Sequence, residues 1–178
     1  MATMVSPTLK SVARLFDYPS EGFESKVGEA EAALSGYQKA REALQSFLRE
    51  VEGMPIEEQQ ELYSRTFELS PNHTLDTSNH LYTGYNRTRC LSKMRSMYKA
   101  FDFESEHLVR GELPDYLPAV LEFVAVLDDR ELKDDFCKTY LSRSLEALLG
   151  TFKGDDSPYR HLVDVALQVV RADLKGGK

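Results

Sequence analysis

The amino-acid sequence predicts an all-α fold, a single-domain bundle of about eight helices around a buried central helix. Apolar residues recur at intervals of three and four along most of the chain, which is the spacing of amphipathic helices. No stretch shows the alternation of apolar and polar residues that a strand requires. From Tyr116 to Leu127 the only charged side chain is Glu122, and a helix that is apolar around its whole circumference must be enclosed by other elements.

Four helices are predicted before residue 68. Ser6-Pro7 opens the first helix and Tyr18-Pro19 stops it, because proline suits a first turn but ends a run that precedes it. Ser20 is predicted to cap the second helix, Gly36 and Gly53 to close the second and third, and Pro55 to precede the fourth. Their apolar faces carry Leu9, Val12 and Phe16; Phe23, Val27 and Leu34; Ala40, Leu44, Phe47 and Val51; and Leu62, Tyr63 and Phe67.

Residues 68–87 are predicted to form a long, ordered loop, because Ser, Pro, Asn, Thr, Asp and Gly dominate this stretch and the helical period lapses. Loops beyond about 12–15 residues are uncommon within compact domains and are often functional. A fifth helix then carries Cys90, Met94, Tyr98 and Phe101 on one face. A second linker, residues 102–113, leads to the central helix.

The start of the central helix is marked by Pro114, which ends the preceding segment, and by Asp115, which is predicted to be the N-cap. Pro118 then falls in the first turn, where its missing N–H breaks no helical hydrogen bond. The helix carries Glu122 inward. An unpaired buried carboxylate costs several kcal/mol, so Glu122 is expected to have an Arg, Lys or Tyr partner or to be protonated.

A long helix with apolar residues from Leu132 to Leu149 is predicted after the central helix, and Gly150 and Gly154 break it. Ser157-Pro158 opens the last helix, and residues 175–178 are predicted to be a frayed tail. With 178 residues, the whole chain, 1–178, is expected to be one domain.

The composition argues against several classes of protein. A net charge of -7 argues against general nucleic-acid binding and suits a basic partner. No apolar run approaches the roughly 18–20 residues of a membrane span, and no signal peptide is recognisable, so we expect a cytoplasmic chain without stable membrane insertion. Cys90 and Cys137 form no CxxC pair and are interpreted as buried apolar residues.

Motifs for catalysis are missing. His73, His80, His107 and His161 show no metal-ligand spacing, and no nucleotide-binding or hydrolase motif occurs. The sequence therefore predicts no metal, no cofactor and no enzyme. Two alternatives stay open. One is a small helical metal-binding protein or enzyme that uses His73, His80, Asp76 and Glu122, and the other is a regulatory adaptor for another protein.

Five segments of the chain resemble the cytoplasmic chaperones that mature molybdenum-containing redox enzymes, the TorD/DmsD/NarJ family, and above all its NarJ-like branch. The segments are Leu15–Pro19, Tyr63–Leu69, Leu81–Gly84, Arg89–Tyr98 and Glu112–Phe123. Members of the family often have His where this chain has Tyr116, so no role of that imidazole carries over.

The resemblance implies a non-catalytic helical chaperone, a monomer or a homodimer. Its partner would be the catalytic subunit of a molybdenum-containing oxidoreductase, bound through an N-terminal segment of the twin-arginine type until cofactor insertion is complete, before export or membrane docking. A groove of carboxylates and aromatic rings would suit guanidinium groups beside an apolar stretch. Capping and ligand contact are both open for Asp115, as are a structural ion pair and ligand contact for Glu122. The predicted peptide-binding residues are Asp115, Glu112, Tyr116, Glu122, Asn79, His80, Tyr82 and Tyr85.

Overall fold

The computed structural model describes residues 6–176, and all of their regular structure is helical apart from one isolated β-bridge between Asp76 and Tyr116. The α-helices are α1 (Pro7–Arg14), α2 (Phe23–Ala33), α3 (Gln38–Val51), α4 (Ile56–Tyr63), α5 (Gly84–Ala100), α6 (Glu106–Val109), α7 (Leu117–Val126), α8 (Arg130–Phe136), α9 (Ser142–Thr151) and α10 (Tyr159–Gly176). Three shorter segments complete the set, the π-helical η1 (Ser64–Glu68) and η3 (Cys137–Leu141) and the 3-10 helix η2 (Thr77–His80). The predicted all-α class is confirmed.

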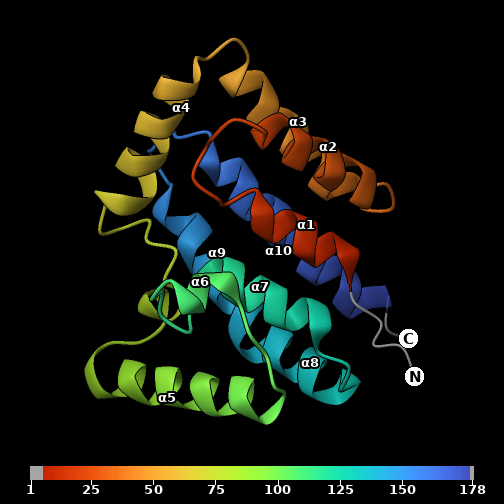
Figure 1. Ribbon diagram of the computed structural model, residues 1–178, viewed down its shortest axis with the longest axis vertical. Helices are drawn as coiled ribbons and strands as arrows, with labels where there is room; N and C mark the ends of the chain where they lie inside the picture. Colours follow the sequence, from red (N-terminus) through yellow and green to blue (C-terminus); the bar gives the residue numbers. More distant parts are fainter. Residues whose placement is uncertain (1–5, 177–178) are drawn as a thin grey trace.

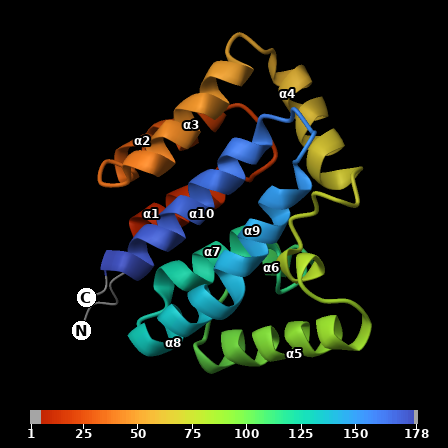
Figure 2. The same cartoon turned by 180° about the vertical axis from the view of Figure 1, so that it is seen from behind.

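Helix α7 is the centre of the molecule. Every residue from Leu117 to Val126 is buried except Glu122 and Val126, which are half-buried. Helices α1 and α6 pack against α7, and Figures 1 and 2 both show it between α1 and α8. The strongly apolar sequence of this segment thus predicts its position, because only an interior helix can bury its whole circumference.

The other helices form one continuous apolar core around α7. Helix α10 packs against α3, α9 and α1, and Figure 2 shows α10 running along α1. Aromatic rings join α3, α4 and α10, with the Tyr159 ring in contact with the rings of Phe47, Tyr63 and Phe67. Helix α5 lies at one end of the molecule in both views and buries only Met94 and Tyr98 among its residues.

Two predicted caps are wrong. The N-cap of α7 is Tyr116 and not Asp115, because the Asp115 carboxylate is turned away from the helix toward Ser78. The N-cap of α2 is Gly22 and not Ser20. Gly22 has φ +91°, a left-handed conformation that glycine adopts at little cost, and this turn aims α2 back along the molecule.

The predicted loops are longer than the observed ones. Residues 68–87 contain η2, and α5 begins within them at Gly84, while linker 102–113 contains α6. Residues 175 and 176 of the predicted tail belong to α10, and residues 177 and 178 lie outside the described part of the chain. Short helices in polar sequence escape a periodicity search because they contain a single turn.

A π-helical segment continues α4 without a break. In η1 the backbone N–H of Leu69 donates to the Ser64 carbonyl at 2.9 Å, a bond that spans five residues where an α-helix spans four. The second such segment, η3, joins α8 to α9. The long helix predicted after the central helix is therefore continuous, but it is α-helical in α8, π-helical in η3 and α-helical again in α9.

Candidate functional site

A groove of about 530 Å³ lies where the end of α1, the segment η1, helix α6 and the start of α7 meet. These elements can be followed in Figure 1 around α6. We call it the acidic groove, because the carboxylates of Asp17, Glu68, Glu106, Glu112 and Glu122 line it together with the rings of Tyr18, Tyr63, Tyr116 and His107. Three of the segments that resemble the chaperone family contribute to its lining, namely Leu15–Pro19, Tyr63–Leu69 and Glu112–Phe123.

The cations of the acidic groove are already paired. Each Lys or Arg that lines it has a carboxylate partner, in the pairs Arg14–Glu29, Lys26–Asp17 and Arg110–Glu106, and His107 is paired with Glu122. Glu68 and Glu112 are exposed and have no cationic partner among residues 6–176. The groove therefore has an uncompensated negative charge that an incoming cation can pair with.

Glu122 is held at the base of the acidic groove. Ser105 Oγ donates to Glu122 Oε2 at 2.6 Å, and His107 Nε2 lies 3.5 Å from Glu122 Oε1. Burial acts to raise the pKa of Glu122, but hydrogen bonds from His107 and Ser105 outweigh it and hold the pKa below its usual range. The predicted Arg, Lys or Tyr partner, and the protonated alternative, are wrong, because α6 supplies an imidazole and its N-cap serine instead.

His107 is the titratable partner in this cluster. Its hydrogen bond to Glu122 raises the pKa of the imidazole against the opposing effect of burial, and the carboxylates of Glu122 and Asp17 add to the rise. The ring lies 5.3 Å from that of Tyr116, which is half-buried. The carboxylates of Glu122 and Asp17 therefore favour the protonated form of the His107 imidazole.

Tyrosines give the acidic groove an aromatic wall. Tyr63 is buried, and its hydroxyl donates to the Phe16 carbonyl at 2.9 Å. Tyr18 packs edge-on against Tyr63 with ring centroids 5.4 Å apart and is 46% exposed, so part of the residue is accessible to a ligand. A guanidinium group can stack on such a face while its N–H groups reach a carboxylate.

Asp115 lies behind the acidic groove in the interior, at 0% exposure. Its Oδ2 accepts hydrogen bonds from the Ser78 backbone N–H at 3.1 Å and the Ser78 hydroxyl at 2.5 Å, and Arg87 Nη2 lies 3.4 Å away. Its carbonyl accepts from the N–H and hydroxyl of Thr77 at 2.9 and 2.7 Å. We call this group of bonds the Asp115 clamp, because it fastens η2 and the start of α5 to the start of α7.

The remaining predicted peptide-binding residues lie away from the acidic groove, on η2 and the start of α5. Asn79 is exposed, His80 Nε2 lies 2.7 Å from the Thr74 carbonyl, Tyr82 is half-buried and Tyr85 is 75% exposed. Of the predicted set, the structure thus brings Glu112, Tyr116 and Glu122 together.

Sequence reasoning missed Asp17, Tyr18, Tyr63, Glu68 and His107 as residues of the groove. A signal for four of them was present, because they lie within Leu15–Pro19 and Tyr63–Leu69, two of the segments that resemble the chaperone family. His107 lies outside those segments.

The residues of the metal-binding alternative have separate partners. His73 is close to Thr151 and Asp155, His80 to Thr74, Asp76 to Arg87, and Glu122 to Ser105 and His107. Within residues 6–176, no group of three or more His, Cys, Asp or Glu side chains is arranged to hold a metal ion.

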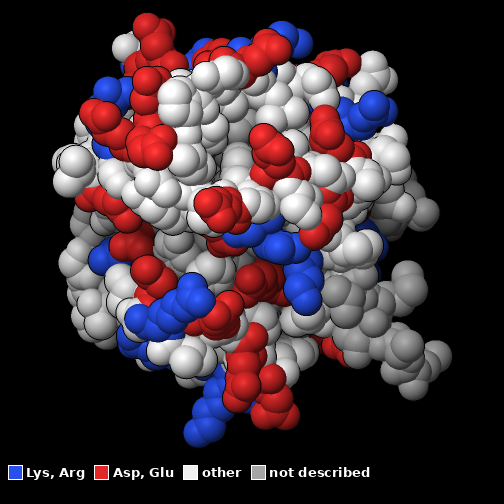
Figure 3. All heavy atoms as spheres, turned by 45° about the horizontal axis from the view of Figure 1, so that its top comes forward, with Lys and Arg blue, Asp and Glu red and all other residues white. Residues whose placement is uncertain are grey.

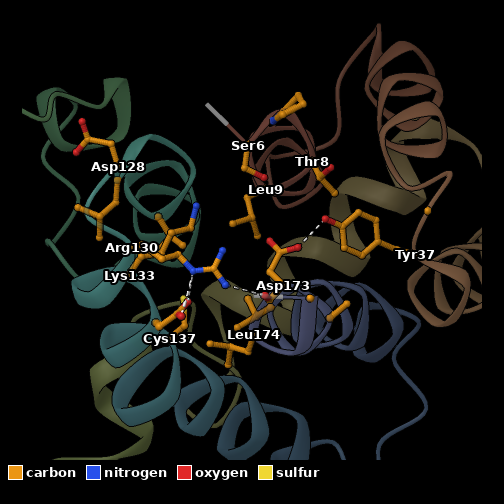
Figure 4. A pocket seen from close by; sticks show the side chains of 18 residues that line it. Ser6, Thr8, Leu9, Tyr37, Asp128, Arg130, Lys133, Cys137, Asp173 and Leu174 are labelled. Carbon is orange, nitrogen blue, oxygen red and sulfur yellow. Dashed lines mark hydrogen bonds and ion pairs between the residues drawn. The ribbon is translucent and has the colours of Figure 1, made fainter. Parts of the chain in front are cut away.

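A separate hollow of about 850 Å³ lies between α1, α8 and α10 (Figure 4) and contains none of the predicted site residues. The Tyr37 hydroxyl donates to Asp173 Oδ1 there at 2.6 Å, and Arg130 Nη2 donates to the Asp173 carbonyl at 3.3 Å. Cys137 is buried in its wall, and burial raises the pKa of the thiol to about 12. Cys137 is thus a buried apolar residue as predicted, while Cys90 is half-buried.

Comparison with known proteins identifies the family. The model of the nitrate reductase delta subunit family matches residues 30–162, well over half of the chain. The chain belongs to this family. The match includes η1, α6 and the start of α7, which form most of the acidic groove.

Two relatives have similar descriptions. A probable nitrate reductase molybdenum cofactor assembly chaperone, NarW of Escherichia coli (strain K12), is 26% identical over 168 residues, which are 93% of this chain and 69% of the relative. The probable chaperone of the same kind, NarJ of Bacillus subtilis (strain 168), is 27% identical over 164 residues, 90% of this chain and 86% of the relative. The resemblance to the maturation chaperones is confirmed, and these proteins are described as chaperones and not as enzymes.

One finding bears on membranes. Within residues 6–176, none of the helices combines the length and the apolar character that crossing a bilayer requires.

Proposed function

We propose that this chain is a cytoplasmic assembly chaperone for the catalytic subunit of a molybdenum-containing oxidoreductase of the nitrate reductase kind. It binds the N-terminal segment of that subunit, holds the subunit while the molybdenum cofactor is inserted, and releases it before export or membrane docking. The family match and the descriptions of the two relatives support the choice of client. The chaperone acts as a monomer or a homodimer.

The acidic groove is the proposed binding site, and its unpaired carboxylates are the observation that carries the proposal. Glu68 and Glu112 are exposed without a cationic partner among the described residues, whereas the basic residues beside them are each paired. An arginine of the client can pair with either carboxylate and stack on the partly exposed ring of Tyr18. Lysine would pair less well, because it lacks the flat guanidinium.

Glu122, Tyr116 and Asp115 take different parts in this proposal. Tyr116 and Glu122 line the groove, so they contact the bound segment or the water around it. Asp115 is enclosed, so we assign it a positioning role, in which it holds the start of α7 and thereby Glu112 and Tyr116. Asn79, His80, Tyr82 and Tyr85 contact a part of the client beyond the groove, on the surface of η2 and α5.

Calorimetric titration with the twin-arginine segment of the co-expressed catalytic subunit tests the proposal. Glu68→Gln and Glu112→Gln should each weaken binding by roughly two- to fivefold, which corresponds to about 0.4–1 kcal/mol for an exposed charge pair. Glu42→Gln is the matched control, since Glu42 is exposed on α3 and lines none of the hollows described above. Equal affinity of the parent and the Glu68→Gln/Glu112→Gln double variant would exclude the acidic groove as the site.

A further inference from the structure

A buried histidine fastens the loop that follows η1 to the turn between α9 and α10, residues 152–158. His73 is 5% exposed, and its ring stacks on that of Phe152, with centroids 4.1 Å apart and an angle of 7° between the planes. Its Nδ1 lies 2.8 Å from Thr151 Oγ1, and its Nε2 lies 3.0 Å from Asp155 Oδ2. We call this group of contacts the His73 latch. None of its four residues lines the acidic groove.

The hydrogen bonds of the latch assign a proton to both ring nitrogens of His73. The Thr151 hydroxyl donates its only proton to the Leu148 carbonyl at 2.6 Å, so it can act toward Nδ1 only as an acceptor. The Asp155 carboxylate, which faces Nε2, is also an acceptor. Both ring N–H groups therefore donate, and an imidazole with two N–H groups is a cation. The stack on Phe152 suits this charge, because the faces of aromatic rings attract cations.

The titratable groups around the latch leave this cation paired with one anion. The backbone N–H of Ser157, followed by His73, holds the pKa of Asp155 below its usual range, and Arg65 on η1 adds to this effect. His80 on η2 is the other histidine nearby, and burial, followed by the charge of His73, lowers the pKa of His80. At neutral pH, Asp155 is therefore ionised and His80 is neutral.

The latch holds one end of the segment that carries Glu68. Before Glu68 in the chain, Thr66 Oγ1 lies 2.9 Å from Ser157 Oγ, and after it His73 reaches Asp155. Both contacts end on the turn between α9 and α10. Glu68 itself is exposed and lines the acidic groove. Its position in the groove therefore depends on a short segment that is tied to one turn at both ends.

We propose that the His73 latch regulates the acidic groove, holding Glu68 in place while the imidazole is protonated and releasing its segment when that proton is lost to solvent. A neutral ring keeps a single N–H. If it is Nδ1–H, the lone pair of Nε2 faces the Asp155 carboxylate. If it is Nε2–H, the Thr151 hydroxyl must leave the Leu148 carbonyl to donate to Nδ1. Either form leaves one partner without its hydrogen bond, which opens the latch. The effect on binding rests on the proposed function, whereas the latch itself does not.

Asp155→Asn should make the latch independent of this proton. The Ser157 N–H donates to Asp155 Oδ1 at 2.8 Å, so in the variant it holds the amide oxygen there and turns the amide NH₂ group toward Nε2. A neutral His73 then accepts from the amide at Nε2 and donates from Nδ1 to Thr151, and every partner is satisfied. Asp156→Asn is the matched control, because Asp156 is the exposed neighbour in the chain and loses the same charge.

Hydrogen exchange of residues 64–73 tests the latch without a ligand. Proteins are compared at the same pH, at about pH 5 and about pH 9, which bracket the range in which histidine usually changes its charge. At the lower pH the parent should exchange no faster than Asp155→Asn. At the higher pH the parent and Asp156→Asn should both exchange at least about fivefold faster than Asp155→Asn. Equal exchange in the three proteins at the higher pH would overturn the proposal.

Nuclear magnetic resonance of the ring nitrogens tests the proton assignment itself. In the parent at about pH 5, both ring N–H groups of His73 should be visible and slow to exchange, because the ring is buried. In Asp155→Asn at about pH 9, only Nδ1 should carry a proton. A single N–H in the parent at the lower pH, or a proton on Nε2 in the variant at the higher pH, would contradict the proposed latch.

Calorimetric titration with the twin-arginine segment connects the latch to the acidic groove. His107 in the groove also titrates, but it is common to all three proteins, so affinities are compared at one pH. At about pH 9, Asp155→Asn should bind the segment at least about fivefold more tightly than the parent does. Acidic side chains predominate on the face in Figure 3, so losing any carboxylate weakens the general attraction for cations, and Asp156→Asn controls for this loss. Equal affinities of the parent and Asp155→Asn would refute the regulation.

These measurements separate the latch from the proposed function. If hydrogen exchange and the ring nitrogens respond as expected while the parent does not bind the twin-arginine segment, the latch stands and the proposed client is wrong. If the parent binds the segment through Glu68 and Glu112 while Asp155→Asn exchanges like the parent at the higher pH, the chaperone proposal stands and the latch fails.

Discussion

Removing the Asp115 carboxylate should destabilise the protein strongly, although Asp115 does not cap a helix. In Asp115→Ala the buried N–H and hydroxyl of Ser78 lose their acceptor, and Arg87 loses one of its two carboxylates. Each buried donor left without an acceptor costs about 1–3 kcal/mol, and two donors of the fully buried Ser78 lose theirs, so we expect a loss of about 3–5 kcal/mol in the free energy of unfolding. For a chain of this size about 1 kcal/mol shifts the melting temperature by roughly 2–4 °C, so we expect a decrease of roughly 6–20 °C.

Asp115→Asn should cost less, about 1–2 kcal/mol, because the amide oxygen can still accept the hydrogen bonds of Ser78. The second oxygen, Oδ1, has no hydrogen-bond partner among residues 6–176, so an amide group in its place loses no existing bond. The measurement is thermal melting followed by circular dichroism. Glu112→Ala is the control, since this exposed carboxylate three residues away should change stability by less than about 0.5 kcal/mol. A melting temperature of Asp115→Ala within about 2 °C of the parent would refute the buried clamp.

The remaining predictions concern the acidic groove and one turn. Glu122→Ala should lower stability by about 1–2 kcal/mol in a denaturant titration, because it removes two hydrogen-bonding contacts at a half-buried site; a change above about 4 kcal/mol would show that Glu122 is fully enclosed. The raised pKa of His107 stabilises the folded state fully below about pH 6.5, and this is lost as pH rises through the folded-state pKa, while the lowered pKa of Glu122 stabilises it above about pH 4.5. The difference in melting temperature between the parent and His107→Gln should therefore shrink as the pH rises above about 6.5, and a constant difference would contradict the ion pair. Binding of the twin-arginine segment should weaken as salt rises, and Glu112→Gln should reduce the slope; identical slopes in titrations at several salt concentrations would exclude Glu112 from the contact. Gly22→Ala should cost about 1–2 kcal/mol because of its positive φ, and a melting temperature equal to the parent's would mean that the turn relaxes.

The fold could be predicted from the sequence where a buried segment shows an apolar pattern of residues. The segment from Leu117 to Ala125 is enclosed because its composition leaves no face for water, apart from Glu122. Turn geometry was less accessible. Ser20 and Asp115 are good capping residue types at plausible places, yet Gly22 and Tyr116 occupy the cap positions.

The candidate site was accessible only in part, because its residues are far apart along the chain. The Asp115 carboxylate meets Ser78 and Arg87, 37 and 28 residues away, and no local pattern indicates such a contact. Glu112 and Tyr116 could be named from one segment that resembles the family. The pairing of Lys26 with Asp17, which leaves Glu68 and Glu112 as the groove's free charges, depends on helix packing that the sequence does not display.

The position of Glu68 in the acidic groove depends on the π-helical winding of η1. A π-segment contains one residue more than the α-helix it interrupts, and one residue corresponds to a rotation of about 100° around a helix axis. If η1 took up regular α-helical winding with all of its residues retained, the side chain of Glu68 would point about 100° away from the groove. A related chain with one residue fewer here can form an unbroken α-helix and still direct a carboxylate into the groove, whereas a chain that keeps the residue needs the wider turn to present Glu68 beside the aromatic wall at Tyr63.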